Sequence, residues 1–157
     1  MKRSREEIDH LVASLAEGHG LGGINPSEDQ YRELLADERE GLVQYINLLK
    51  FKPEAEYPAG HELADTGLSG ADAYMRYGEI AVRKVEERGG RLPYLNQTEQ
   101  IIIGRSPDWD QVAVMEYPDR EAFIDMLQDP EYLASLVHRD AGLERTVVII
   151  SRPLFGG

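Results

Sequence analysis

Residues 42–51 read LVQYINLLKF, a run of mostly large apolar side chains that stops just before Pro53. Apolar residues occupy both the odd and the even positions of this run, so neither face of a strand formed here would suit contact with water. The segment therefore predicts a strand that is buried on both faces.

A helix and a second strand are predicted next. Ser69 begins a helix with an apolar stripe, and Gly89-Gly90 follows its last turn, where glycine commonly ends helices. Residues 91–104 then predict a strand whose character changes at Asn96-Gln97, where a bend or a hairpin is an alternative. The long stretch from 52 to 69 has no period and is predicted to be a loop.

The remaining elements complete a recognisable order. Residues 110–117 form an apolar segment typical of a strand, Asp119 can cap the helix after it, and Asp129-Pro130 starts a further helix. Residues 146–151 predict the last strand. The order is strand, helix, strand, strand, broken helix, strand. It predicts an α+β protein with a ferredoxin-like βαββαβ fold and a four-stranded antiparallel sheet.

The N-terminal part is more polar and predicts two helices. Ser4 and Ser27 are each followed three residues later by Glu or Gln, the pattern of a capping box. Residues 18–23 contain four glycines and predict a linker between the helices. We therefore expect a helical extension at 1–41 and the ferredoxin-like domain at 42–157.

The apolar character of the strands on both faces has a consequence for assembly. A ferredoxin-like sheet carries helices on one face only, so its other face would alternate toward polar residues if it met water. Residues 112–115 and 147–150 are apolar throughout. We expect a second copy of the chain to cover that face, the alternative being that the N-terminal helices lie across it.

Composition excludes several classes of function. The 157 residues include no cysteine, which removes disulfides, thiolate nucleophiles and cysteine-based metal centres. The net charge of −12 and the scattered basic residues argue against binding nucleic acid. No apolar run is long enough to cross a membrane and no secretion signal precedes the first helix, so we expect a cytoplasmic protein.

An ordered series of short motifs carries a family resemblance. It comprises Asn47-Leu48-Leu49-Lys50-Phe51, Tyr57, Ala73-Tyr74, Tyr77-Gly78, Gly89-Gly90-Arg91, Trp109-Asp110, Glu116-Tyr117-Pro118, Phe123, Pro130-Glu131-Tyr132, His138-Arg139 and Gly142-Leu143. From about residue 42 to 152 the chain resembles a bacterial family of unknown function in the dimeric alpha-beta-barrel superfamily. The resemblance implies a homodimer in which two four-stranded sheets face each other, and it implies no established activity.

Two polar residues within the apolar strands are candidates for binding a ligand. In the superfamily's cofactor-free oxygenases an asparagine and aromatic groups can hold the substrate, which is the role the resemblance implies for Asn47; the alternative is a structural hydrogen bond. Glu116 is either a base with a raised pKa or the partner of Arg91 or Arg139 in an ion pair.

A second group of candidates lies on and beside the helices. His138 can exchange a proton near neutral pH and Arg139 can grip a carboxylate at two points, although cations at a helix end also serve as caps. The remaining candidates for the same cleft are Tyr74, Tyr77, Arg91 and Tyr132. Packing is the alternative role for the tyrosines.

No metal or cofactor is expected. The four histidines are far apart in the sequence, and the adjacent pair His61-Glu62 would point apart on any regular element. The sequence therefore favours a homodimer that binds a small organic molecule between sheet and helices, as a cofactor-free oxygenase or isomerase. The alternatives are a non-catalytic metabolite-binding module and a structural dimerisation module.

Overall fold

The computed structural model describes residues 2–155, which form four strands and five helices. In chain order they are α1 (Arg5–His19), α2 (Glu28–Ala36), β1 (Val43–Phe51), α3 (Gly70–Glu87), β2 (Arg91–Gln97), β3 (Gln111–Tyr117), α4 (Arg120–Met126), α5 (Pro130–Gly142) and β4 (Leu143–Ser151). The order of strands and helices is the one that the sequence predicts, with the last strand beginning three residues early.

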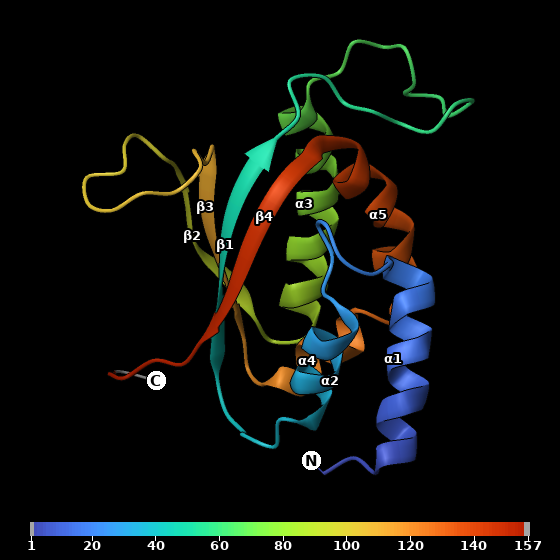
Figure 1. The fold of residues 1–157 in the computed structure, drawn as a ribbon, viewed down its shortest axis with the longest axis vertical. Coiled ribbons are helices and arrows are strands. Elements are labelled where there is room, and N and C mark those ends of the chain that lie inside the picture. The colour runs from blue at the N-terminus through green and yellow to red at the C-terminus, as the bar shows by residue number, and fades with distance from the viewer. Residues whose placement is uncertain (1, 156–157) are drawn as a thin grey trace.

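The strands form one antiparallel sheet in the order β2-β3-β1-β4 (Figure 1). The strand at 42–51 becomes β1 and lies in the middle, between β3 and β4. Helices α3 and α5 pack against each other and cover one face of the sheet. The α+β class and the ferredoxin-like fold are thus confirmed.

Local signals in the sequence account for the helix starts. The side chains of Ser4 and Ser27 accept hydrogen bonds from main-chain N–H groups three residues later, and both capping boxes are complete. Ser69 and Asp119 cap α3 and α4 in the same way. Each cap satisfies an N–H group that the helix itself leaves unpaired.

The N-terminal helices lie on the helix side of the sheet. Val12 and Leu15 of α1 and Tyr31 and Leu35 of α2 are buried in the same core as Tyr45 of β1. In Figure 1, the C-terminal end of α1 meets the lower end of α5, and α2 lies next to α4. These helices therefore leave the opposite face of the sheet uncovered.

The predicted strand over residues 91–104 is too long. β2 ends at Gln97, which pairs with Gln111, and residues 98–110 form the loop that turns the chain back into β3. Ile101, Ile102 and Ile103 are 48%, 85% and 88% exposed. Isoleucine favours the strand conformation, but these three residues have no neighbouring strand to pair with and therefore remain in a loop.

The uncovered face of the sheet is apolar at its centre. Residues directly opposite each other on neighbouring strands share a face. We call the uncovered face the open face, and its central residues are Ile46, Leu48, Val112, Val114, Val147 and Ile149. Val147 and Ile149 are 44% and 49% exposed.

None of the helices within residues 2–155 is long and apolar enough to span a membrane.

Candidate functional site

A cavity of about 1120 Å³ lies between the helix-covered face of the sheet and the helices, and we call it the sheet–helix cavity. Its walls come from β1, α3, α5 and the segment that joins α1 to α2. Five of the eight candidate residues line it: Asn47, Tyr74, Tyr77, Tyr132 and Arg139. The fold therefore brings together residues that lie up to 92 positions apart in the sequence.

Arg139 places a positive charge in the wall of this cavity. Its Nη1 donates to Oδ1 of Asn25 at 3.0 Å, and its Nη2 donates to the main-chain oxygen of Ile24. A guanidinium carries five N–H donors and stays charged in proteins. Asp140 acts on this charge electrostatically, but within residues 2–155 no carboxylate lies within ion-pair distance of the guanidinium, so several of its donors remain available.

Three tyrosines surround this charge. The hydroxyls of Tyr77 and Tyr132 share a hydrogen bond of 2.7 Å, and the ring of Tyr74 lies 5.1 Å from that of Tyr77 and 5.1 Å from that of Phe51. Burial raises the pKa of Tyr74 and raises that of Tyr132 well above its ordinary value. The hydroxyls of Tyr74 and Tyr132 are therefore neutral at physiological pH and do not balance the charge of Arg139.

Asn47 lies on β1 in the opposite wall. Its Nδ2 donates to the main-chain oxygens of Tyr45 at 3.0 Å and Ala113 at 3.3 Å. Because a carbonyl oxygen only accepts, these two bonds fix which end of the amide faces the strands. Its Oδ1 has no donor within the described part of the chain and is left as an acceptor in the cavity wall.

Two candidates lie on the other face of the sheet. Nε of Arg91 donates to Oε2 of Glu116 at 2.7 Å, and Nε2 of Gln44 donates to Oε1 at 2.9 Å. The hydrogen bonds from Arg91 and Gln44 lower the pKa of Glu116. This is the geometry of an ion pair rather than of a base, and the structure does not bring these two residues to the sheet–helix cavity.

His138 is likewise separated from Arg139. Its Nδ1 shares a hydrogen bond of 2.7 Å with the hydroxyl of Tyr57, and the ring of His61 stacks on Tyr57 at 4.6 Å. Burial, followed by the charge of Arg76, lowers the pKa of His138. The histidine thus holds the 52–69 loop against α5 instead of facing the sheet–helix cavity, because consecutive helix residues point about 100° apart.

Sequence reasoning missed the contribution of the N-terminal segment. His19 at the end of α1 and Asn25 in the loop after it line the sheet–helix cavity, and Asn25 holds Arg139 from 114 positions away. The glycine-rich stretch before Asn25 was expected to serve as a linker. No local pattern relates this loop to α5, since the contact exists only once both helices are packed.

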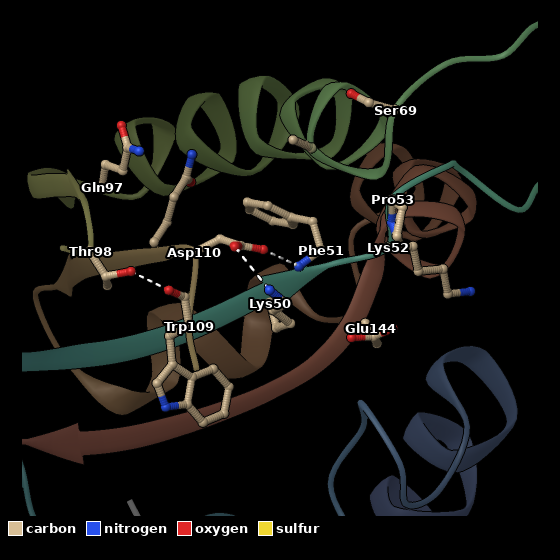
Figure 2. Close-up of a pocket in the computed structure, with 12 residues that line it drawn as sticks. Lys50, Phe51, Lys52, Pro53, Ser69, Gln97, Thr98, Trp109, Asp110 and Glu144 are labelled. Atoms are coloured by element: carbon tan, nitrogen blue, oxygen red, sulfur yellow. Dashed lines mark hydrogen bonds and ion pairs between the residues drawn. The ribbon is translucent and has the colours of Figure 1, made fainter. Parts of the chain in front are cut away.

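A second cavity, of about 520 Å³, lies at the end of β1 (Figure 2). Its charged side chains already form ion pairs, with each other or with neighbouring residues. Lys50 pairs with Asp110 at 3.2 Å, and the other oxygen of Asp110 accepts from the main-chain N–H of Phe51 at 2.8 Å. Trp109, also drawn in Figure 2, lies under the guanidinium of Arg145 at 4.9 Å. This second cavity offers a ligand fewer unpaired polar groups than the sheet–helix cavity.

The described residues contain no cluster of side chains that could bind a metal ion. Within residues 2–155, no group of three or more histidine, aspartate or glutamate side chains is arranged to hold a metal ion. Near Arg139 the sheet–helix cavity offers a cation and the hydroxyls of Tyr74 and Tyr132, and in the opposite wall the amide oxygen of Asn47. Other parts of its wall hold Asp37, which pairs with Arg39 and Arg120, and the carboxylates of Glu33 and Glu79. The cation, the hydroxyls and the amide oxygen suit hydrogen bonding to an anionic organic molecule.

Comparisons with known proteins agree with this fold and give no activity. A crystal structure of a protein of unknown function from Rhodopseudomonas palustris is 33% identical, with a TM-score of 0.75 over 86% of this chain and 99% of that one. The methylated form of that protein gives 34% identity and a TM-score of 0.76 over 87% and 98%.

A weaker likeness is to a dabb family protein with a ferredoxin-like fold from Mesorhizobium loti, at 22% identity and a TM-score of 0.40 over 73% of this chain and 98% of that one. None of the curated proteins compared with the chain matches it. The model of a domain of unknown function, DUF1330, matches residues 60–153, which is more than half of the chain. The chain therefore belongs to the DUF1330 family.

Proposed function

We propose that the protein binds a small organic anion with an apolar, aromatic body in the sheet–helix cavity. The observation that carries the proposal is the guanidinium of Arg139, which lies in the cavity wall with no carboxylate of the described chain within ion-pair distance. A charge removed from water is costly unless it is paired. An anionic ligand would supply the missing partner.

The anionic end of the ligand is assigned to Arg139 and the tyrosines. Two donors of the guanidinium are used by Asn25 and Ile24, which hold it in place, and the remaining donors suit a carboxylate or a sulfonate. The hydroxyl of Tyr74 has no hydrogen-bond partner in the described chain and can donate to the same group.

The apolar end of the ligand is assigned to the sheet. Leu49 and Phe51 of β1 and Ala113 and Met115 of β3 line the same cavity, and Oδ1 of Asn47 is the polar acceptor among them. A flat ring with one hydroxyl or amine group would fit this combination, since the amide oxygen requires a donor. A volume of about 1120 Å³ is ample for one such molecule.

Homodimerisation is the second part of the proposal. The centre of the open face is apolar, and ionic groups flank it: Arg91 with Glu116 at one end of the sheet, Lys50 at the other. An apolar centre with a polar rim is the usual anatomy of a protein interface. Pairing through this face would also explain why β1 is apolar on both sides. Light scattering at micromolar concentration is expected to give the mass of two chains, and the mass of one chain would contradict it.

The cavity suits either of two uses. A cation and neutral hydroxyls can hold a ligand unchanged, or they can stabilise an oxyanion that forms on it, as a cofactor-free oxygenase or an isomerase requires. We favour the catalytic use, because His19, whose Nδ1 has no hydrogen-bond partner in the described chain, also lines the cavity. Non-catalytic binding is the alternative.

Binding itself can be tested with 8-anilinonaphthalene-1-sulfonate (ANS), an anionic aromatic molecule whose fluorescence rises in apolar sites. We expect saturable binding to the folded protein. Arg139→Met should weaken it by about tenfold or more, since a hydrogen bond to a charged group is worth about 1.5–3 kcal/mol. Arg83→Met removes the same charge from the outer surface of α3, where Arg83 is 54% exposed, and should leave the affinity unchanged. Equal affinities of the Arg139 variant and the wild type would refute the proposal.

A further inference from the structure

We propose that His19 is the general base of the sheet–helix cavity and removes a proton from the carbon next to the carbonyl of a bound 2-oxo acid with an aromatic side chain. The protein would then interconvert the keto and enol forms of that acid. This inference rests on the proposed function, because it requires an anionic ligand held by Arg139.

The hydrogen bonding of the imidazole fixes its reactive nitrogen. Nε2 of His19 lies 2.8 Å from the main-chain oxygen of Leu127. Since that oxygen can only accept, Nε2 carries the proton, and in the neutral ring Nδ1 then has a free lone pair. Nδ1 has no hydrogen-bond partner within residues 2–155, and the side chain lines the cavity.

The surroundings of His19 keep the ring neutral. Burial lowers the pKa of His19, the bond to Leu127 opposes this, the charge of Arg139 lowers the pKa further and Asp140 raises it. The net pKa lies below the ordinary value of 6.5. Tyr132, whose ring centre lies 6.0 Å from that of His19, stays neutral. The histidine is therefore an unprotonated base at neutral pH.

The same cavity supplies the groups that the rest of the reaction needs. Nδ1 takes the proton, the electrons of the carbon–hydrogen bond form a carbon–carbon double bond, and the carbonyl electrons move to oxygen. Arg139, which binds the carboxylate, also stabilises the resulting enolate oxygen. The imidazolium then returns the proton to that oxygen, which gives the enol, or to the carbon, which restores the keto acid. No oxidant, reductant or other co-reactant is consumed.

Phenylpyruvate is a suitable probe, because it has a carboxylate, an aromatic ring and an acidic methylene group. The experiment follows deuterium incorporation at that methylene in D₂O by NMR, in a buffer without amines. We expect the wild type to accelerate exchange above the buffer rate. His19→Gln should lose about 100-fold or more of this acceleration. Glutamine can still donate to Leu127 but has no basic nitrogen, and ANS affinity and the midpoint of thermal unfolding should stay as in the wild type.

The pH dependence gives a second readout that a structural role would not move. Because the pKa of His19 is lowered, the accelerated exchange should hold at neutral pH and fall only below about pH 6.5, as the imidazole takes up a proton. His19→Gln should not have this step.

The outcomes separate this inference from the proposed function. If phenylpyruvate displaces ANS but the wild type does not accelerate exchange, or if His19→Gln accelerates it equally, the general base is refuted and the binding proposal stands. If neither ANS nor phenylpyruvate binds, the proposed function fails and the inference fails with it.

Discussion

The close contact between α3 and α5 sets the shape of the sheet–helix cavity, and it depends on two glycines. A methyl group added at Gly142 would lie 2.2 Å from the main-chain oxygen of Gly70 and 2.9 Å from the main-chain nitrogen of Tyr74. Ordinary contact begins near 3.4 Å. Gly142→Ala must therefore push the helices apart by roughly 1 Å, because the atoms it meets belong to the backbone and cannot rotate away.

The expected size of the effect follows from two opposing contributions. Overpacking of this kind costs about 1–3 kcal/mol, whereas replacing glycine by alanine in a helix gains up to about 1 kcal/mol. We expect Gly142→Ala to lower the free energy of unfolding by about 1–2 kcal/mol. For a chain of this size that corresponds to a decrease in Tm of about 2–8 °C. The separation of the helices should also move Arg139 away from Tyr74 and weaken ANS binding.

Urea unfolding at one fixed protein concentration measures this change, since the proposed dimer would make the unfolding midpoint depend on concentration. Gly78→Ala is the matched control. Gly78 lies within α3, and an added methyl group there would meet nothing within 4 Å. It should raise the free energy of unfolding by about 0.5–1 kcal/mol. If Gly142→Ala is as stable as Gly78→Ala, the argument from close backbone contact is wrong.

Two further predictions concern charge and assembly. Burial raises the pKa of Asp129, but hydrogen bonds from Arg88 and Lys84 outweigh it and bring the value down to about 2. This carboxylate therefore stabilises the fold above its ordinary pKa of 3.8, and the contribution is lost as the pH falls toward 2. Asp129→Asn should be less stable than wild type in urea at pH 7, with a difference that shrinks below pH 4; a constant difference would contradict the assignment. Ile149→Glu, at the centre of the open face, should give a folded monomer by light scattering and circular dichroism, whereas a dimer of unchanged affinity would place the interface elsewhere.

Short-range signals explain why so much of the fold follows from the sequence. The helix caps Ser4, Ser27, Ser69 and Asp119 each accept a hydrogen bond from a main-chain N–H group three positions later. The periodic spacing of apolar residues likewise identifies each helix or strand from its own segment. The isoleucines at 101–103 were predicted as strand because their local preference is strong, but a strand also requires a neighbour, which the sequence does not reveal.

The candidate site was predictable only in part, because strand register decides which residues share a face. Asn47 pairs with Ala113 on β3, and Glu116 lies three positions further, so the two side chains point to opposite sides of the sheet. The division of strands into two faces follows from pairing, which no single segment encodes. The same holds for His19, which enters the cavity through contacts with residues more than 100 positions away.

The most direct test of the central claim is a crystal structure of the protein grown with phenylpyruvate. Our account predicts the ligand in the sheet–helix cavity, with its carboxylate within hydrogen-bond distance of the guanidinium of Arg139 and its ring between Asn47 and Tyr77. A ligand bound only on the open face or in the cavity near Trp109, with none at Arg139, would contradict it.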